Sequence, residues 1–141
     1  MNTIFGLVSD TAASAIWAMV VASLLPLAMA MLTKVFGGFR LADNSHPRDF
    51  LQHTTGMAAR ANAAQQNSYE TLPVFLAAVL VAMLFFVPQL IVNTLAWLYV
   101  LIRIGFCAAY ITNLATFRSI LWVLSLACCL MLFYLAIQVS V

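Results

Sequence analysis

The sequence predicts an all-α integral membrane protein in which four transmembrane helices form a bundle. Of its 141 residues, 65% are apolar and 7% are charged, and the mean hydropathy is +1.05. Soluble domains contain about 45–50% apolar and about 25% charged residues, so this composition excludes an ordinary soluble protein. The few charged residues are also separated by long uncharged runs, which is the second observation that favours membrane spans.

The uncharged runs divide into helices of membrane-spanning length. A bilayer core of about 30 Å requires about 20 helical residues, so the run over 71–102 is too long for a single span. The segment Val87-Pro88-Gln89 is the best place for a turn, because proline ends or interrupts a helix. The predicted spans are approximately 11–36, 65–86, 89–111 and 116–139, with a polar loop over 37–60, and residues 1–141 form a single membrane domain.

The first apolar run is expected to remain in the protein as a permanent span. The N-terminus lacks the basic segment and the small-residue cleavage site of a removable signal peptide. Pro26 lies deep in this span, where it removes one backbone hydrogen bond and is expected to bend the helix. Gly37 and Gly38 are expected to end it.

The distribution of basic residues predicts the orientation in the membrane. The residues that flank the two polar connections are Lys34, Arg40, Arg48, Arg60 and Arg118, whereas the turn at Pro88 carries no charge. By the positive-inside rule, loops 37–60 and 112–118 are cytoplasmic and both termini lie outside. The formal net charge is only +2 and the basic residues form no tract, which excludes nucleic acid as a partner.

Polar side chains are concentrated over residues 60–73, at the start of the second span. A polar group in lipid costs several kcal/mol unless it has a partner. On a helix that turns about 100° per residue, Arg60 and Asn67 nearly eclipse each other, and Glu70 lies about 80° away. Gln65 points to another face. One side of this helix therefore presents a cation, an amide and a carboxylate.

A second charged position lies inside the third span. Arg103 and Tyr110 are seven residues apart and share a helical face, and a guanidinium at this depth should face the protein interior. Glu70 is the acidic residue next to a span on this side, so we predict that Glu70 and Arg103 lie close, directly or through a bound molecule. A structural ion pair between two helices remains the alternative. For Gln65 and Asn67 the alternative is interhelical hydrogen bonding.

The remaining reactive side chains favour structural roles. Cys107, Cys128 and Cys129 fall inside predicted spans and are expected to be inert core residues. His46 and His53 lie outside the spans, with no cysteine and few carboxylates nearby, so the sequence predicts no metal site and no bis-histidine haem. Arg118 is most simply a juxtamembrane anchor, and Trp122 an interfacial aromatic residue.

Taken together, these motifs resemble the MAPEG family, the membrane-associated proteins in eicosanoid and glutathione metabolism, and more closely its bacterial branch. The matching positions run through most of the chain in the family's order: Asp43-Asn44-Ser45-His46-Pro47-Arg48, Arg60-Ala61, Ala64-Gln65, Asn67, Glu70, Pro73, Arg103, Tyr110 and Arg118-Ser119. The resemblance implies a left-handed four-helix bundle assembled as a homotrimer in the bacterial inner membrane. It also implies that glutathione, as co-substrate, is held between neighbouring subunits near the cytoplasmic face.

The resemblance also implies residue roles. Asn67 and Glu70 would bind the peptide backbone and amino group of glutathione, and Gln65 would add a contact from the adjoining face. Arg103 and Tyr110 would hold its carboxylates. Arg118, with Ser119 beside it, falls where family enzymes place the group that stabilises the thiolate. The mammalian enzymes carry a further arginine where this chain has Ala63, and Arg60 is the basic residue nearly one turn earlier.

Three functions follow as hypotheses. The first is a glutathione transferase or peroxidase that acts on a hydrophobic electrophile or a lipid hydroperoxide. The second is a non-catalytic member of the same fold, which binds lipid or serves as an accessory subunit of a larger membrane complex. The third is a small proton-driven exporter. We rank it last because such an exporter needs a carboxylate well inside the first span, where this chain has none.

Overall fold

The computed structural model describes residues 10–140, which are almost entirely helical. The elements in order are α1 (Ala12–Gly37), the 3-10 helix η2 (Leu41–Ser45), α2 (Pro47–Gln52), α3 (Gly56–Leu84), α4 (Gln89–Ile111) and α5 (Ala115–Ser140). Helices α1, α3, α4 and α5 are each long and apolar enough to cross a membrane. The predicted all-α architecture with four spans is confirmed, and so is the turn between the second and third spans.

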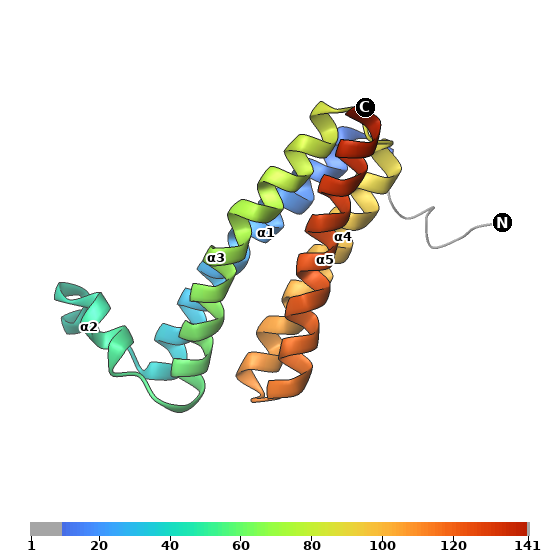
Figure 1. Ribbon diagram of the computed structural model, residues 1–141. Helices are drawn as coiled ribbons and strands as arrows, with labels where there is room; N and C mark the ends of the chain where they lie inside the picture. The colour runs from blue at the N-terminus through green and yellow to red at the C-terminus, as the bar shows by residue number, and fades with distance from the viewer. Residues whose placement is uncertain (1–9, 141) are drawn as a thin grey trace.

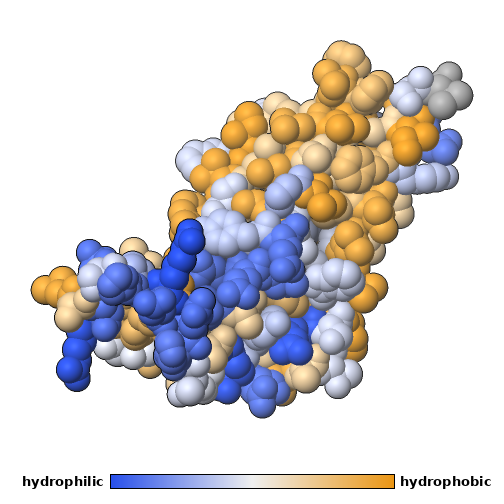
Figure 2. Space-filling model, turned by 60° about the vertical axis from the view of Figure 1, so that its left-hand side comes forward, coloured by the Kyte–Doolittle hydropathy of each residue, from blue (hydrophilic) through white to orange (hydrophobic). Residues whose placement is uncertain are grey.

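The four long helices form two antiparallel pairs. Helix α1 packs chiefly against α3, and α4 against α5. The two pairs meet at the end that carries the start of α1 and the end of α5, and they diverge toward the opposite end (Figure 1). The segment that contains η2 and α2 extends sideways from this diverging end, and we call it the arm (residues 39–55). Hydrophilic residues gather over the arm and the same end of the bundle (Figure 2).

Small buried residues bring the helices together. Ala15, Ala18, Ala78, Ala82 and Ala96 are all buried in the main apolar cluster. Small side chains let helix backbones approach closely, which suits association in lipid, where van der Waals packing replaces the hydrophobic effect. Large apolar side chains point outward instead; Trp17 is 63% exposed and Leu101 is 64% exposed. In a membrane-spanning bundle these side chains contact lipid.

Helix α3 begins at Gly56, well before the expected start of its span near residue 65. The difference has a simple cause. Hydropathy identifies only the part of a helix that lies in the apolar layer of the membrane. The alanine-rich segment over 57–64 has a high helix propensity, so the helix already begins before that part. The polar residues over 60–70 therefore lie on regular helix, in a known register with the apolar residues that follow.

The connection between α4 and α5 is tight and places their ends side by side. Asn113 has a φ of 62°, a left-handed conformation that asparagine tolerates better than most residues. Its backbone N–H donates to the carbonyl of Tyr110 (3.1 Å), and the N–H of Leu114 donates to that of Ala109 (2.9 Å). These bonds reverse the chain between Tyr110 and Arg118, and so bring these two side chains together.

Candidate functional site

Arg103 is buried in the bundle, where its guanidinium is held by neutral groups. It is 1% exposed. Its Nη1 donates to Asn67 Oδ1 (3.0 Å) and its Nη2 to Ser68 Oγ (3.0 Å), while the guanidinium carbon lies 4.1 Å from the ring centroid of Phe106. Within residues 10–140 it forms no ion pair. Two hydrogen-bond acceptors and an aromatic face thus replace the carboxylate that the sequence suggested.

Asn67 connects Arg103 to Glu70. Arginine can only donate, so the amide oxygen of Asn67 must face it and the amide NH₂ must point away. Asn67 Nδ2 lies 3.5 Å from Glu70 Oε2, a long hydrogen-bond distance, and the Glu70 side chain is exposed. Arg103 and Glu70 therefore lie at the two ends of a chain of contacts through Asn67 and do not pair directly.

Ser68 is a contact of Arg103 that the sequence analysis did not identify. Its hydroxyl donates to the carbonyl of Ala64 (2.8 Å) and accepts from Arg103, and it lies 3.9 Å from Cys107 Sγ. A buried guanidinium needs several acceptors. The small hydroxyl beside Asn67, on a helix already expected to meet the third span, was the signal that could have identified it.

The divergence of the helix pairs leaves a groove in which several predicted site residues meet. This polar groove has a volume of about 280 Å³. Its lining residues are Asn67 from α3, Phe106 and Tyr110 from α4, and Arg118, Ser119, Trp122 and Val123 from α5. Four of the predicted site residues, from three helices, are thus brought together. Arg103 is not among the lining residues; it lies behind Asn67.

Arg118 is the cation at the surface of the polar groove. Its guanidinium carbon lies 4.2 Å from the ring centroid of Tyr110, whose ring in turn packs edge-to-face against Phe106 (5.2 Å). The described residues provide no hydrogen-bond partner for its side-chain N–H groups. Stacking occupies the flat face of a guanidinium and leaves its N–H edge free to bind an anion. Ser119 Oγ donates to the carbonyl of Ala115 (3.1 Å) and can still accept a hydrogen bond.

The structure does not bring Arg60 and Gln65 into the polar groove. Arg60 Nε donates to the carbonyl of Ile111 (3.0 Å), one of the last carbonyls of α4, which lack partners within their own helix. Gln65 Oε1 is buried and has no hydrogen-bond partner among the described residues. Arg60 and Asn67 both contact α4, as their shared helical face predicts.

We expect Arg60→Ala to lower the free energy of unfolding by about 1.5 kcal/mol or more, because it removes a hydrogen bond from a charged donor to a helix-terminal carbonyl. Reversible unfolding in detergent measures the effect. A variant as stable as the parent would contradict the structural role.

The described residues also line other hollows. An apolar cavity of about 190 Å³ lies between α3, α4 and α5, and is lined by Glu70, Thr71, Val74, Tyr99, Trp122, Ser125, Leu126 and Cys129. A larger, open hollow of about 540 Å³ lies between the arm and the end of α1, and its lining includes His46, Asp49 and His53. It contains none of the predicted binding residues, so size does not identify the site here.

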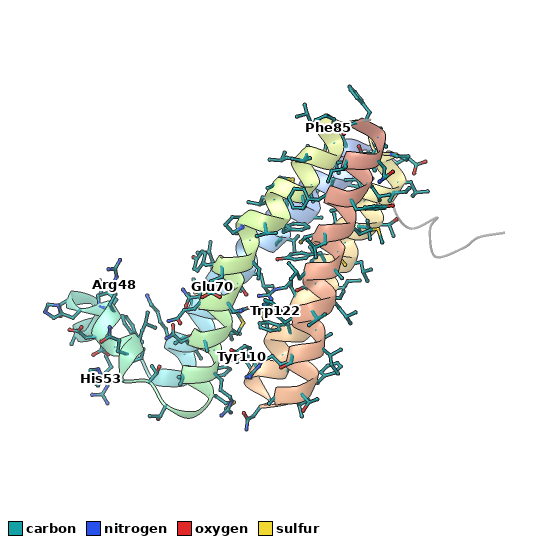
Figure 3. The ribbon with its side chains drawn as sticks, in the orientation of Figure 1. Arg48, His53, Glu70, Phe85, Tyr110 and Trp122 are labelled. Atoms are coloured by element: carbon teal, nitrogen blue, oxygen red, sulfur yellow. The ribbon has the colours of Figure 1, made fainter. Side chains whose placement is uncertain are left out.

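Figure 3 shows the positions of three residues that line the polar groove or the apolar cavity. Glu70 on α3 and Trp122 on α5 lie at similar heights along the bundle, and Tyr110 lies closer to the connection between α4 and α5. Trp122 lines both spaces, and Asn67, which lines the polar groove, contacts Glu70, which lines the apolar cavity. The two spaces are therefore neighbours.

Comparison with known proteins identifies the family. The MAPEG family model matches residues 11–138, a segment that contains nearly all of the four spanning helices and every residue of the polar groove. No curated protein and no solved structure matches the chain. The family match covers far more than half of the sequence, from the start of α1 to the end of α5. The chain therefore belongs to the MAPEG family.

Proposed function

We propose that this protein is a membrane-embedded, glutathione-dependent transferase or peroxidase that acts on a hydrophobic electrophile or a lipid hydroperoxide. The observation that carries the proposal is the Arg118 guanidinium, which is stacked on Tyr110 at the polar groove, and whose N–H edge no described residue occupies. Membership of the MAPEG family supports a glutathione-related membrane function in general.

Arg118 would act by stabilising the thiolate of glutathione. A free thiol has a pKa of about 8.5 and is mostly protonated at neutral pH, whereas the thiolate is the nucleophile. A cation at the sulfur favours the thiolate, and the thiol proton passes to solvent. In the transferase reaction the sulfur attacks an electrophilic carbon, a C–S bond forms, and the leaving group departs with its electron pair.

In the peroxidase reaction the thiolate attacks the terminal oxygen of the hydroperoxide. The O–O bond breaks, and the alkoxide leaves and takes up a proton to become an alcohol. The sulfenic acid of glutathione then reacts with a second glutathione, which gives the disulfide and water. Both reactions use the same thiolate, so they place the same demand on Arg118.

The binding roles follow from the charge on each part of the groove. We assign the amino group of glutathione to the exposed Glu70 carboxylate and its peptide groups to Asn67, whose amide is oriented by Arg103. Tyr110 is assigned to a carboxylate of glutathione, Arg103 acts on the ligand through the Asn67 amide that it orients, and Arg60 and Gln65 are assigned to outer contacts. In our proposal the active form is a homotrimer in a bacterial inner membrane, with a neighbouring subunit completing each site, both termini outside, and loops 37–60 and 112–118 cytoplasmic.

A second candidate is a non-catalytic protein that binds lipid or belongs to a larger membrane complex. The observation that favours it is the small number of available cations. Arg103 donates to neutral side chains of its own subunit, and Arg60 donates to the end of α4. Among the lining residues of the polar groove, Arg118 is the only cation, whereas glutathione carries two carboxylates.

Titration of glutathione into the detergent-purified protein tests the two candidates. We expect saturable binding that Glu70→Gln weakens about tenfold or more, because a hydrogen bond between charged groups contributes about 1.5–3 kcal/mol. Asp49→Asn is the matched control, since it removes an exposed carboxylate from the arm. No heat of binding and no thermal stabilisation at millimolar glutathione would favour the second candidate.

A further inference from the structure

We propose that the arm lies along the membrane surface at the polar end of the bundle and docks onto the headgroups of anionic phospholipids. In the docked state the Leu41 side chain enters the boundary between headgroups and acyl chains, and the Arg48 guanidinium binds lipid phosphate. This interaction does not depend on the proposed glutathione chemistry. It follows from the attachment, the exposure, the charge and the position of the arm.

The arm is attached to α1 in a fixed direction. Gly38, with a φ of 67°, ends this helix, and the N–H of Phe39 donates to the carbonyl of Lys34 (3.0 Å). The Phe39 ring packs edge-to-face against Phe50 of α2, with a centroid distance of 4.9 Å, and Lys34 Nζ lies 4.5 Å from the centroid of the Phe39 ring. Phe50 also packs closely on Gly37, where a Cβ would lie 2.6 Å from Phe50 Cζ. These contacts hold the base of the arm, so the arm projects from the bundle as a structured element.

Beyond this base the arm has little packing of its own. No residue of η2 or α2 is buried. Leu41, the first residue of η2, is 95% exposed, more than any other large apolar residue that the structure describes. Removing an apolar side chain of this size from water is favourable. The arm therefore gains stability if Leu41 contacts an apolar layer.

The charges that the arm offers to a partner are positive, although it contains two arginine and two aspartate residues. Asp43 Oδ2 accepts from the backbone N–H of Arg40 (2.7 Å). Asp49 lies in the first turn of α2, where the free N–H groups of the helix start stabilise a carboxylate. Arg40 and Arg48 are exposed, and neither forms an ion pair with a described residue. Because a free guanidinium binds phosphate with two parallel hydrogen bonds, the arm complements an anionic lipid surface.

The position of the arm matches the headgroup layer. Exposed apolar residues continue along α1 to Val35 and Phe36, so the apolar layer reaches the last turn of this helix. The arm begins soon after α1 ends and extends sideways from the bundle (Figure 1). In Figure 3 Arg48 lies at the upper edge of the arm, level with Glu70, and His53 lies at the lower edge. Glu70 is the last charged residue before the apolar part of α3, so Arg48 lies at the boundary where lipid phosphates are found.

Fluorescence quenching in nanodiscs tests the inference. The full-length protein with Ala42→Cys carries a nitrobenzoxadiazole label at this exposed position; the three native cysteines are buried and should not react. The nanodiscs contain equimolar phosphatidylcholine and phosphatidylglycerol. Nitroxides on the lipid headgroups report contact with the membrane surface, iodide reports exposure to water, and fluorescence lifetimes separate the docked and undocked populations.

We expect headgroup nitroxides to quench the label strongly and iodide to quench it weakly. In nanodiscs of phosphatidylcholine alone, the ratio of docked to undocked arm should fall at least about fivefold. The reason is that each basic residue near an anionic lipid surface contributes about this factor to binding.

Variants identify the contacts that hold the arm. Leu41→Ser should lower the ratio of docked to undocked arm about tenfold, and Arg48→Gln should lower it about fivefold. Leu114→Ser is the control for the first variant, because Leu114 is exposed in the other connection at the same end of the bundle. Asp49→Asn is the control for the second, because it removes an exposed charge next to Arg48. Neither control should lower the ratio.

The alternative occupants give different results. If iodide quenches the label fully and headgroup nitroxides do not, the arm is free in water and the docking is overturned. If neither quencher reaches the label and lipid composition has no effect, a protein surface such as a second copy of the chain covers the arm, and the docking is again overturned. It is also overturned if Leu41→Ser and Leu114→Ser give equal ratios, or if Arg48→Gln matches the parent.

Discussion

Replacement of Arg118 by alanine is expected to lower kcat/KM for conjugation of an apolar electrophile about 100-fold. A neighbouring guanidinium that lowers the pKa of a bound thiol by about two units contributes about 2.7 kcal/mol to thiolate formation. In this structure Arg118 has no hydrogen-bond partner for its N–H groups among the described residues, so its charge is available to a ligand. Steady-state kinetics measure the rate, and the ultraviolet absorbance of the bound thiolate measures the cause.

Two variants make this result specific. Arg48→Ala removes an exposed cation from the arm at the same end of the bundle, and should leave the rate unchanged. Tyr110→Phe keeps the ring on which Arg118 stacks and should retain the thiolate signal, whereas Tyr110→Ala should reduce it. A parent-like rate and a parent-like thiolate absorbance in Arg118→Ala would remove this residue from the mechanism.

The fold was predictable because the properties that determine it are local. Uncharged runs and the Pro88 turn were enough to find four spans, since bilayer thickness sets helix length. The start of α3 at Gly56 was not found, because nothing in the hydropathy of residues 57–64 separates a helix that continues into water from a loop. The sequence likewise gives no indication that η2 and α2 extend sideways from the bundle.

The candidate site was predictable in part. Asn67, Tyr110, Arg118 and Ser119 were expected and do line one groove. Arg103 was expected to meet Glu70 because a buried charge needs a partner, but a sequence cannot show that an amide and a hydroxyl will provide it. The apolar cavity could not be found at all, since its shape depends on side chains such as Leu126 and Val74 that look like ordinary lipid-facing or core residues.

The neutral environment of Arg103 leads to the second prediction. We expect Ser68→Ala to lower the free energy of unfolding by about 1.5–3 kcal/mol, because it leaves a buried guanidinium with one acceptor fewer. Ser125→Ala is the matched control. Ser125 is equally buried but donates only to its own helix backbone, so its loss should cost much less. Reversible unfolding in detergent compares the two variants.

Arg103→Met completes this test by removing the charge itself. Methionine needs no acceptors, but the change leaves Asn67 Oδ1 without its donor, so the free energy of unfolding should fall by about 1–3 kcal/mol. The variant should also bind glutathione at least about tenfold more weakly, because the Asn67 amide loses the donor that orients it toward Glu70. A variant as stable as the parent but with weaker glutathione binding would mean that Arg103 contributes to ligand binding and not to folding stability. A variant that is unstable but binds normally once folded would mean the reverse, and would assign Arg103 to the packing of α3 against α4.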